Sequence, residues 1–145
     1  MNLEKFVLPE KYKTHHTGID EQHTQLFSIL MTMMTLIKNP PPTIDTELNQ
    51  LLIDLRKYTQ NHFKYEERIM EKIQYPKFES HRELHNNFIT KMISIQKTAI
   101  KNSDEKLALI SQMALFVKDW LLEHVLIEDH ELIAYRNKIE NKDDL

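Results

Sequence analysis

Residues 61–85 read NHFKYEERIMEKIQYPKFESHRELH, and this stretch holds two pairs of residues that can bind a metal ion. His62 and Glu66 are four positions apart, as are His81 and His85, so each pair projects from one face of a helix, about one turn apart. The segment between the pairs contains a proline, which predicts a break that folds one helix back on the other. Three imidazoles and a carboxylate would then meet between antiparallel helices, and these are ligand types for a transition metal.

Composition narrows the classes of protein that these helices can belong to. The chain of 145 residues is 41% hydrophobic and 28% charged, so we expect a single domain over residues 1–145 with a buried core. A formal net charge of −3 shows no basic excess, which predicts no nucleic-acid partner. Because the chain has no cysteine, any metal ion must be held by nitrogen and oxygen ligands.

The sequence also lacks the features of a secreted or membrane-spanning chain. No basic N-terminal region precedes an apolar run, and the longest apolar stretch, residues 27–37, is interrupted by polar residues. We therefore expect a cytoplasmic protein with no membrane contact. The sequence leaves the oligomeric state open, and a monomer is compatible with it.

Apolar residues recur at three- and four-residue spacing along four segments, which predicts amphipathic helices. The expected limits of the four helices are about 20–38, 45–73, 77–101 and 104–127. Asp20 is expected to cap the first helix, and Tyr58 in the second and Leu107 in the fourth are among the expected core positions. Short connections between long helices favour an all-α, up-down-up-down four-helix bundle. We expect an irregular N-terminal arm over residues 1–17 and a short C-terminal helix over about 129–139.

Histidines continue the apolar stripes of these helices. His23 lies near the start of the first helix, and His124 lies near the end of the fourth. In an up-down-up-down bundle these two positions, the pair in the second helix and the pair in the third all lie at the same end. Any one of these histidines alone is more often a buried side chain with ordinary hydrogen bonds. Together, five histidines and one glutamate on core-facing stripes would leave many buried polar groups unpaired unless a cation organises them.

Three other histidines and one carboxylate lie outside this pattern. His15, His16 and His130 are not on the stripes, so we expect them to be exposed or in loops. Asp129 follows His124 by five residues, which places it about 140° away around an ideal helix. Asp129 can reach the same centre only if the fourth helix ends or distorts there.

Four motifs follow one another along nearly the whole chain. They are Gly18-Ile19-Asp20-x-x-His23, His62-x3-Glu66, His81-x3-His85 and Trp120-Leu121-x-x-His124-x4-Asp129. In residue type, spacing and order, these motifs resemble those of the hemerythrin family, and of the single-domain bacterial hemerythrins in particular. One departure from the family pattern is that the tryptophan usual in the N-terminal arm is replaced near Leu8.

The resemblance implies an oxo- or hydroxo-bridged pair of non-haem iron ions that binds dioxygen reversibly. The ligands it implies are His81, His85 and His124 on one iron, His23 and His62 on the other, and Glu66 and Asp129 as bridges. The iron with five ligands would keep a vacant position for dioxygen. The resemblance also places Leu121 over that position, with Trp120 and Phe63 completing an apolar wall.

Several other functions stay open on the sequence alone. A di-iron peroxidase or a nitric oxide reductase would use the same ligands, although we expect an oxygen-binding protein rather than an enzyme. An oxidative di-iron enzyme of the ferritin-like class would carry Glu-x-x-His motifs, and only Asp20-x-x-His23 comes near one. A zinc or copper site is a further alternative, since imidazoles also bind those ions well, and so is a module without metal. The motifs do not say whether dioxygen would be stored, delivered, sensed or scavenged.

Overall fold

The structure, a computed structural model, describes residues 7–101 and 106–143, and nearly all of these residues are helical. The elements are a 3-10 turn (Glu10–Tyr12), α1 (Thr17–Lys38), α2 (Ile44–Lys72), α3 (Phe78–Lys101), α4 (Lys106–His124), a π-helical turn (Val125–Asp129) and α5 (His130–Asp143). We call the segment Val125–Asp129 the π turn. Within the described residues there is no β-strand, as the sequence predicted.

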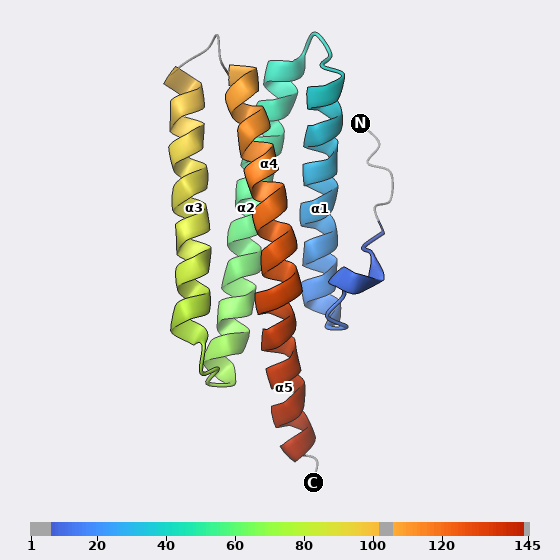
Figure 1. Ribbon diagram of the computed structural model, residues 1–145, viewed down its shortest axis with the longest axis vertical. Helices are drawn as coiled ribbons and strands as arrows, with labels where there is room; N and C mark the ends of the chain where they lie inside the picture. Colours follow the sequence, from blue (N-terminus) through green and yellow to red (C-terminus); the bar gives the residue numbers. More distant parts are fainter. Residues whose placement is uncertain (1–6, 102–105, 144–145) are drawn as a thin grey trace.

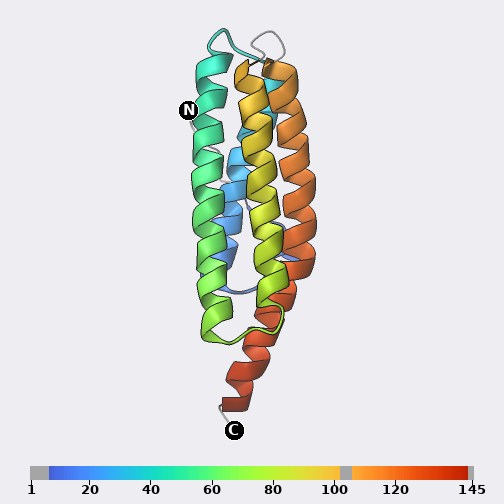
Figure 2. The ribbon, with the colours of Figure 1, turned by 90° about the vertical axis from the view of Figure 1, so that its left-hand side faces the viewer.

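Helices α1 to α4 form an up-down-up-down bundle. Each helix runs antiparallel to the next (Figure 1). α1 packs against α2 and α4, and α3 packs against the same two helices, which closes the four into one bundle (Figure 2). α5 continues the line of α4 through the π turn and extends beyond the end of the bundle. The predicted all-α four-helix bundle is therefore confirmed.

The start of α1 differs from the expected one. His16, rather than Asp20, is the N-cap residue, and its Nδ1 accepts a hydrogen bond of 3.2 Å from the backbone N–H of Ile19. Asp20 lies inside the first turn instead. Its carboxylate accepts hydrogen bonds from the backbone N–H groups of Thr14 and His15 and from the Thr14 hydroxyl. Asp20 thus ties the N-terminal arm to the helix, and the helix begins three residues earlier than the sequence pattern indicates.

The apolar stripes meet in one large core that runs along the bundle axis. On α2, the expected core position Tyr58 is wrong, because its side chain is 42% exposed and Thr59 is buried in its place. The Thr59 hydroxyl donates a 2.6 Å hydrogen bond to the Leu55 carbonyl, which satisfies the buried polar group. Leu107, near the start of α4, is 39% exposed and was also wrongly assigned to the core. At these two positions the three- and four-residue spacing is compatible with either the buried or the exposed face of the helix, and only the packing of the helices decides between them.

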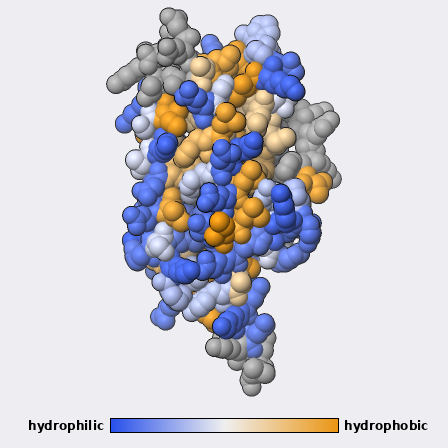
Figure 3. Space-filling view, viewed as in Figure 1, coloured by the Kyte–Doolittle hydropathy of each residue, from blue (hydrophilic) through white to orange (hydrophobic). Residues whose placement is uncertain are grey.

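The N-terminal arm packs along the bundle despite lacking the tryptophan that the resemblance led us to expect. Leu8 is buried in the main core, and the Tyr12 ring lies 5.5 Å from that of Phe27 on α1. On the face shown in Figure 3, apolar patches lie between hydrophilic side chains. Within the described ranges, no helix combines the length and the apolar character that a membrane-spanning segment needs.

Two methionines on α1 test this placement of the core. Met33 is fully buried and Met31 is 51% exposed, although they stand two residues apart. We expect Met33→Ala to lower the free energy of unfolding by about 2 to 5 kcal/mol, because it leaves a cavity in the core. Met31→Ala, the matched control, should change it by no more than about 0.5 kcal/mol. Urea denaturation followed by circular dichroism measures both values, and equal effects would contradict the packing described here.

Candidate metal centre

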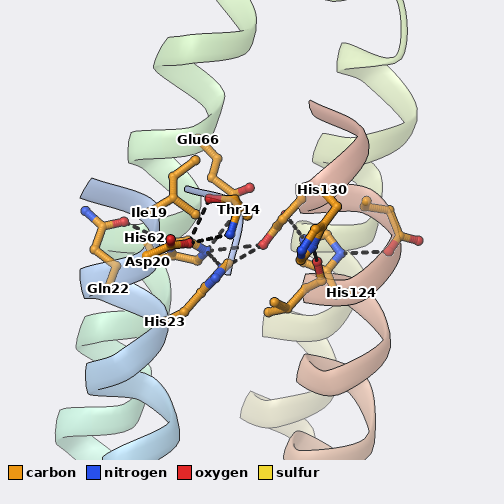
Figure 4. A network of polar contacts seen from close by, with 12 residues as sticks. Thr14, Ile19, Asp20, Gln22, His23, His62, Glu66, His124 and His130 are labelled. Atoms are coloured by element: carbon orange, nitrogen blue, oxygen red, sulfur yellow. Dashed lines mark hydrogen bonds and ion pairs between the residues drawn. The ribbon is translucent and has the colours of Figure 1, made fainter. Parts of the chain in front are cut away.

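Seven buried side chains converge at the end of the bundle where α2 joins α3. They are His23 from α1, His62 and Glu66 from α2, His81 and His85 from α3, His124 from α4 and Asp129 from the π turn. None of the seven is more than 3% exposed. In Figure 4, the side chains from α1 and α2 face those from the end of α4 across the centre of the bundle. The structure thus brings together every ligand that the sequence motifs suggested.

Three imidazoles form one side of this centre. The Nε2 atoms of His81 and His85 lie 3.2 and 3.1 Å from the Nε2 of His124. Two nitrogens bound to one ion at about 2.1 Å and at right angles would be about 3.0 Å apart. On the opposite side, the Nε2 atoms of His23 and His62 are also 3.0 Å apart. Both groups therefore have the spacing of neighbouring ligands around a cation.

The two carboxylates lie between the imidazole groups. Glu66 Oε1 is 2.8 Å from the Nε2 of His62, and its Oε2 is 3.7 Å from that of His81. Asp129 Oδ2 is 2.8 Å from the Nε2 of His23, and its Oδ1 is 3.0 Å from the Nε2 of His124. Asp129 thus faces one imidazole group with each oxygen, and Glu66 lies within 3.7 Å of imidazoles of both groups. Both carboxylates are placed where two metal ions could share them.

Unsatisfied oxygens show that these residues fit a metal rather than a hydrogen-bonded core. Neither oxygen of Glu66 nor Oδ1 of Asp129 makes a hydrogen bond of regular geometry among the described residues, although imidazole nitrogens lie as close as 2.8 Å and both side chains are completely buried. Burying a carboxylate without a counter-charge or donors is costly, and a bound cation removes that cost. With nitrogen and oxygen donors only, the set suits iron and similar transition metals.

The π turn explains how Asp129 reaches the centre. On an ideal α-helix the five-residue spacing from His124 would point Asp129 away from it. A π turn closes its hydrogen bonds over five residues instead of four, so it is wider and returns Asp129 toward the face that carries His124. The distortion that the sequence required is therefore present, and π turns are frequent at functional sites.

His130 was expected to be exposed or in a loop, and the structure corrects this. The residue is half-buried at the first position of α5. Its Nδ1 lies 2.5 Å from the carbonyl oxygen of Val125, and its Nε2 lies 2.9 Å from that of Lys13. His130 thus connects the π turn to the N-terminal arm. Spacing could not reveal this role, because Lys13 is 117 residues away in the chain.

Three residues that the sequence analysis missed contact the Nδ1 atoms of the converging imidazoles. We call these Nδ1 atoms the outward nitrogens, because the Nε2 atoms of the same rings face the centre. The Nδ1–H of His62 donates to Gln22 Oε1 at 2.7 Å, while His85 Nδ1 lies 3.3 Å from Glu67 Oε2. His124 Nδ1 lies 3.5 Å from Glu128 Oε2. These contacts turn the Nε2 atoms toward the centre. Gln22, Glu67 and Glu128 are each the chain neighbour of one of the seven residues, which is the only sequence signal for them.

The electrostatics of the metal-free centre favour exchange of protons for metal. Burial lowers the pKa of His23 and of His85, so both imidazoles stay neutral and keep a lone pair for a metal ion. Burial would also lower the pKa of His124, but the neighbouring Asp129 carboxylate raises this pKa to about 10. Burial, and then the adjacent Asp129, raise the pKa of Glu66 well above its usual value. Without metal, protons are therefore favoured on His124 and Glu66, and a cation would displace them.

Aromatic rings pack against the three-histidine side. Phe63 stacks on His85 with ring centroids 3.8 Å apart, and Trp120 stacks on His124 at 4.4 Å. Phe63 also lies 6.0 Å from the ring of His62, so it borders both sides of the centre. Leu121 is 1% exposed and belongs to the main core. The role of these three residues as a pocket for dioxygen stays a prediction.

Fold and site together define a class: a four-helix bundle with a buried centre for two metal ions. The family model described as "Hemerythrin HHE cation binding domain" matches residues 14–135. The chain belongs to the hemerythrin family. It is 31% identical over 130 residues to the bacteriohemerythrin of Clostridium acetobutylicum, covering 88% of this chain and 98% of that protein. It is 24% identical over 140 residues to the hemerythrin of Themiste dyscrita, covering 92% of this chain and 99% of that protein.

The unequal histidine groups predict unequal effects of single substitutions on iron content. We expect two iron ions per chain in the native protein. His81→Ala should retain less iron than His23→Ala, because it removes a ligand from the three-histidine group, which offers its ion more protein ligands than the two-histidine group does. His15→Ala, in which a 73% exposed side chain is removed, is the control and should keep both ions. Elemental analysis gives the number of iron ions per protein chain for each variant. Two ions per chain in both His81→Ala and His23→Ala would contradict the assignment of these histidines as metal ligands.

Removal of the metal should destabilise the fold. Without a metal ion, the buried Glu66 carboxyl has to take up a proton, and Asp129 keeps only the protonated His124 as a counter-charge. We expect a loss of about 3 to 5 kcal/mol in the free energy of unfolding, the usual effect of removing one partner from a buried charge pair. Thermal and urea unfolding of the metal-loaded and chelator-treated protein provide the comparison. Superimposable curves would show that these residues do not enclose a metal.

Proposed function

We propose that this protein binds dioxygen reversibly at a pair of iron ions held by the seven converging side chains. One observation carries the proposal. The ligand atoms fall into two compact groups, one with His81, His85 and His124 and the other with His23 and His62, and both groups include the same two carboxylates, Glu66 and Asp129. Two metal ions that shared both carboxylates would have three imidazole ligands in one case and two in the other. The ion with two imidazoles would therefore have one protein ligand fewer and could keep a coordination position open.

Iron in such a site would supply an open coordination position and the electrons that dioxygen takes up when it binds. The chain supplies the rest. Its imidazoles fix the two positions, and the Gln22, Glu67 and Glu128 contacts behind them hold the rings in place. The two shared carboxylates offset part of the positive charge, and complete burial keeps bulk water away from it. These features favour binding over irreversible oxidation.

The proposed pocket residues are consistent with a carrier. A carrier must admit dioxygen while withholding protons, whereas an oxidative enzyme needs a proton donor beside the reacting group. Leu121, Phe63 and Trp120 have no titratable side chain, and Leu121 and Phe63 are at most 3% exposed. A peroxidase or a nitric oxide reductase at the same ligands stays the alternative. A cytoplasmic location, the single-domain organisation and the lack of a nucleic-acid partner also remain predictions from the sequence.

A spectroscopic cycle tests the proposed function. Protein loaded with ferrous iron under anaerobic conditions is exposed to air, and dioxygen is then removed by a stream of argon. We expect an intense absorption band to appear in air, to disappear under argon and to return over repeated cycles without loss of amplitude. Loss of the band after one cycle, with hydrogen peroxide or turnover of an added reductant in its place, would support the enzymatic alternative instead.

A substitution at Leu121 tests the pocket. We expect Leu121→Ala to shorten the lifetime of the air-induced band, because a smaller side chain admits water to the centre. Removing this fully buried side chain should also lower the free energy of unfolding by about 2 to 5 kcal/mol. Leu115→Ala, on the same helix but 51% exposed, is the matched control and should change neither quantity. Decay of the band in air at several pH values is the measurement, and equal lifetimes for all three proteins would rule out a pocket at Leu121.

A further inference from the structure

The outward nitrogens of the ligand imidazoles contact chemically different partners on the two sides of the centre. On the three-histidine side, His85 is hydrogen-bonded to the Glu67 carboxylate at 3.3 Å, and His124 lies 3.5 Å from the Glu128 carboxylate, an ion-pair contact without a regular hydrogen bond. On the two-histidine side, the partner of His62 is the neutral amide oxygen of Gln22, at 2.7 Å. The Nδ1 of the second imidazole there, that of His23, has no partner among the described residues. Two carboxylates therefore contact the outward nitrogens of the three-histidine group. The described contacts include no carboxylate at the outward nitrogens of the two-histidine group.

This difference has a known physical effect on metal binding. A carboxylate that accepts a hydrogen bond from an imidazole makes the opposite nitrogen a stronger donor and fixes the orientation of the ring, and losing such a partner typically weakens metal binding by about 10- to 100-fold. A neutral amide orients the ring but adds no negative charge. The three-histidine group therefore has more ligands and also stronger ones, while the two-histidine group is oriented without being strengthened.

A groove on the outer surface reaches the three-histidine side. It lies between α2 and α3, has a volume of about 410 Å³, and is lined by residues that include Glu67 and His85. Lys64, Asn86 and Gln60 contribute polar atoms to its walls. Glu67 and His85 both border this groove, which brings it next to the three-histidine group. Neither His23 nor His62 is among the described residues that line it.

We infer that Glu67 and Glu128 are positioning residues that, together with the neutral Gln22, set the order in which the two metal ions bind. The first divalent cation occupies the three-histidine position and is held tightly, and the second occupies the two-histidine position and is held weakly. Gln22 keeps the second position weak, which makes that ion the exchangeable one. This inference rests on the ligand division of the proposed function, but it concerns metal affinity and not dioxygen.

Stepwise titration with Co²⁺ in the absence of dioxygen tests the order. The absorption bands of bound Co²⁺, read in competition with a chelator, give the two affinities. Paramagnetic shifts of the imidazole N–H signals in NMR spectra show which histidines hold each ion. With one equivalent of Co²⁺ we expect shifted signals from His85 and His124 only, and those from His62 should shift only as the second equivalent is added.

Three variants separate the roles of the outward partners. Glu67→Gln and Glu128→Gln should each weaken the first ion about 10- to 100-fold and bring the two affinities together. Gln22→Glu should strengthen the second ion by about 10-fold or more and leave the first unchanged. Glu71→Gln, an exposed glutamate one turn beyond Glu67 on α2, is the control and should leave both affinities as they are. Metal-free circular dichroism and unfolding curves establish that each variant is folded.

Two results would overturn the inference. One is a first equivalent of Co²⁺ that shifts the His62 signals as strongly as those of His85 in the native protein. The other is a Gln22→Glu variant whose second ion binds no more tightly, which remains informative even if a Glu67 variant fails to fold. Because no dioxygen is used, a failed oxygenation cycle would count against the proposed function while leaving this binding order in place.

Discussion

Two carboxylates buried side by side, Glu66 and Asp129, are the constraint on which the rest of this structure depends. Both are completely inaccessible to solvent, and three of their four oxygens make no hydrogen bond of regular geometry among the described residues. A protein core does not tolerate such groups unless a positive charge lies between them. Without metal, protons on Glu66 and on His124 are the compensation available to these two groups, and bound metal ions would take their place. A pair of cations therefore completes the core at this end of the bundle, where apolar side chains complete it elsewhere.

The same constraint accounts for the irregular features of the fold. Asp129 must be presented from the end of α4, and the π turn provides the extra residue that brings it into line with His124. A widened turn needs outside support, which His130 supplies by contacting the carbonyl groups of Val125 and Lys13. The N-terminal arm is held in turn by Asp20. Elements that look peripheral thus position Asp129 between the two imidazole groups.

Much of this could be predicted from the sequence because the ligands share the period of the core. His62, Glu66 and the leucines before them follow one helical stripe, so the pattern that predicts the bundle also predicts which polar residues face its interior. The resemblance then added Asp129, for which spacing alone required an unspecified distortion. The pattern could not choose between Tyr58 and Thr59, because adjacent positions at the edge of a stripe are separated only by packing.

The partners of the outward nitrogens could not be predicted from the sequence, for a different physical reason. Gln22, Glu67 and Glu128 are ordinary polar residues at half-buried positions, and their roles arise from contacts with the imidazoles rather than from periodicity. The His16 cap likewise depends on a contact that periodicity does not indicate.

Anomalous X-ray scattering at the iron absorption edge, from crystals of the iron-loaded protein, tests most directly whether two ions complete this core. We predict two peaks per chain, one among His81, His85 and His124 and the other beside His23 and His62. A single peak, or iron bound elsewhere on the chain, would contradict that prediction.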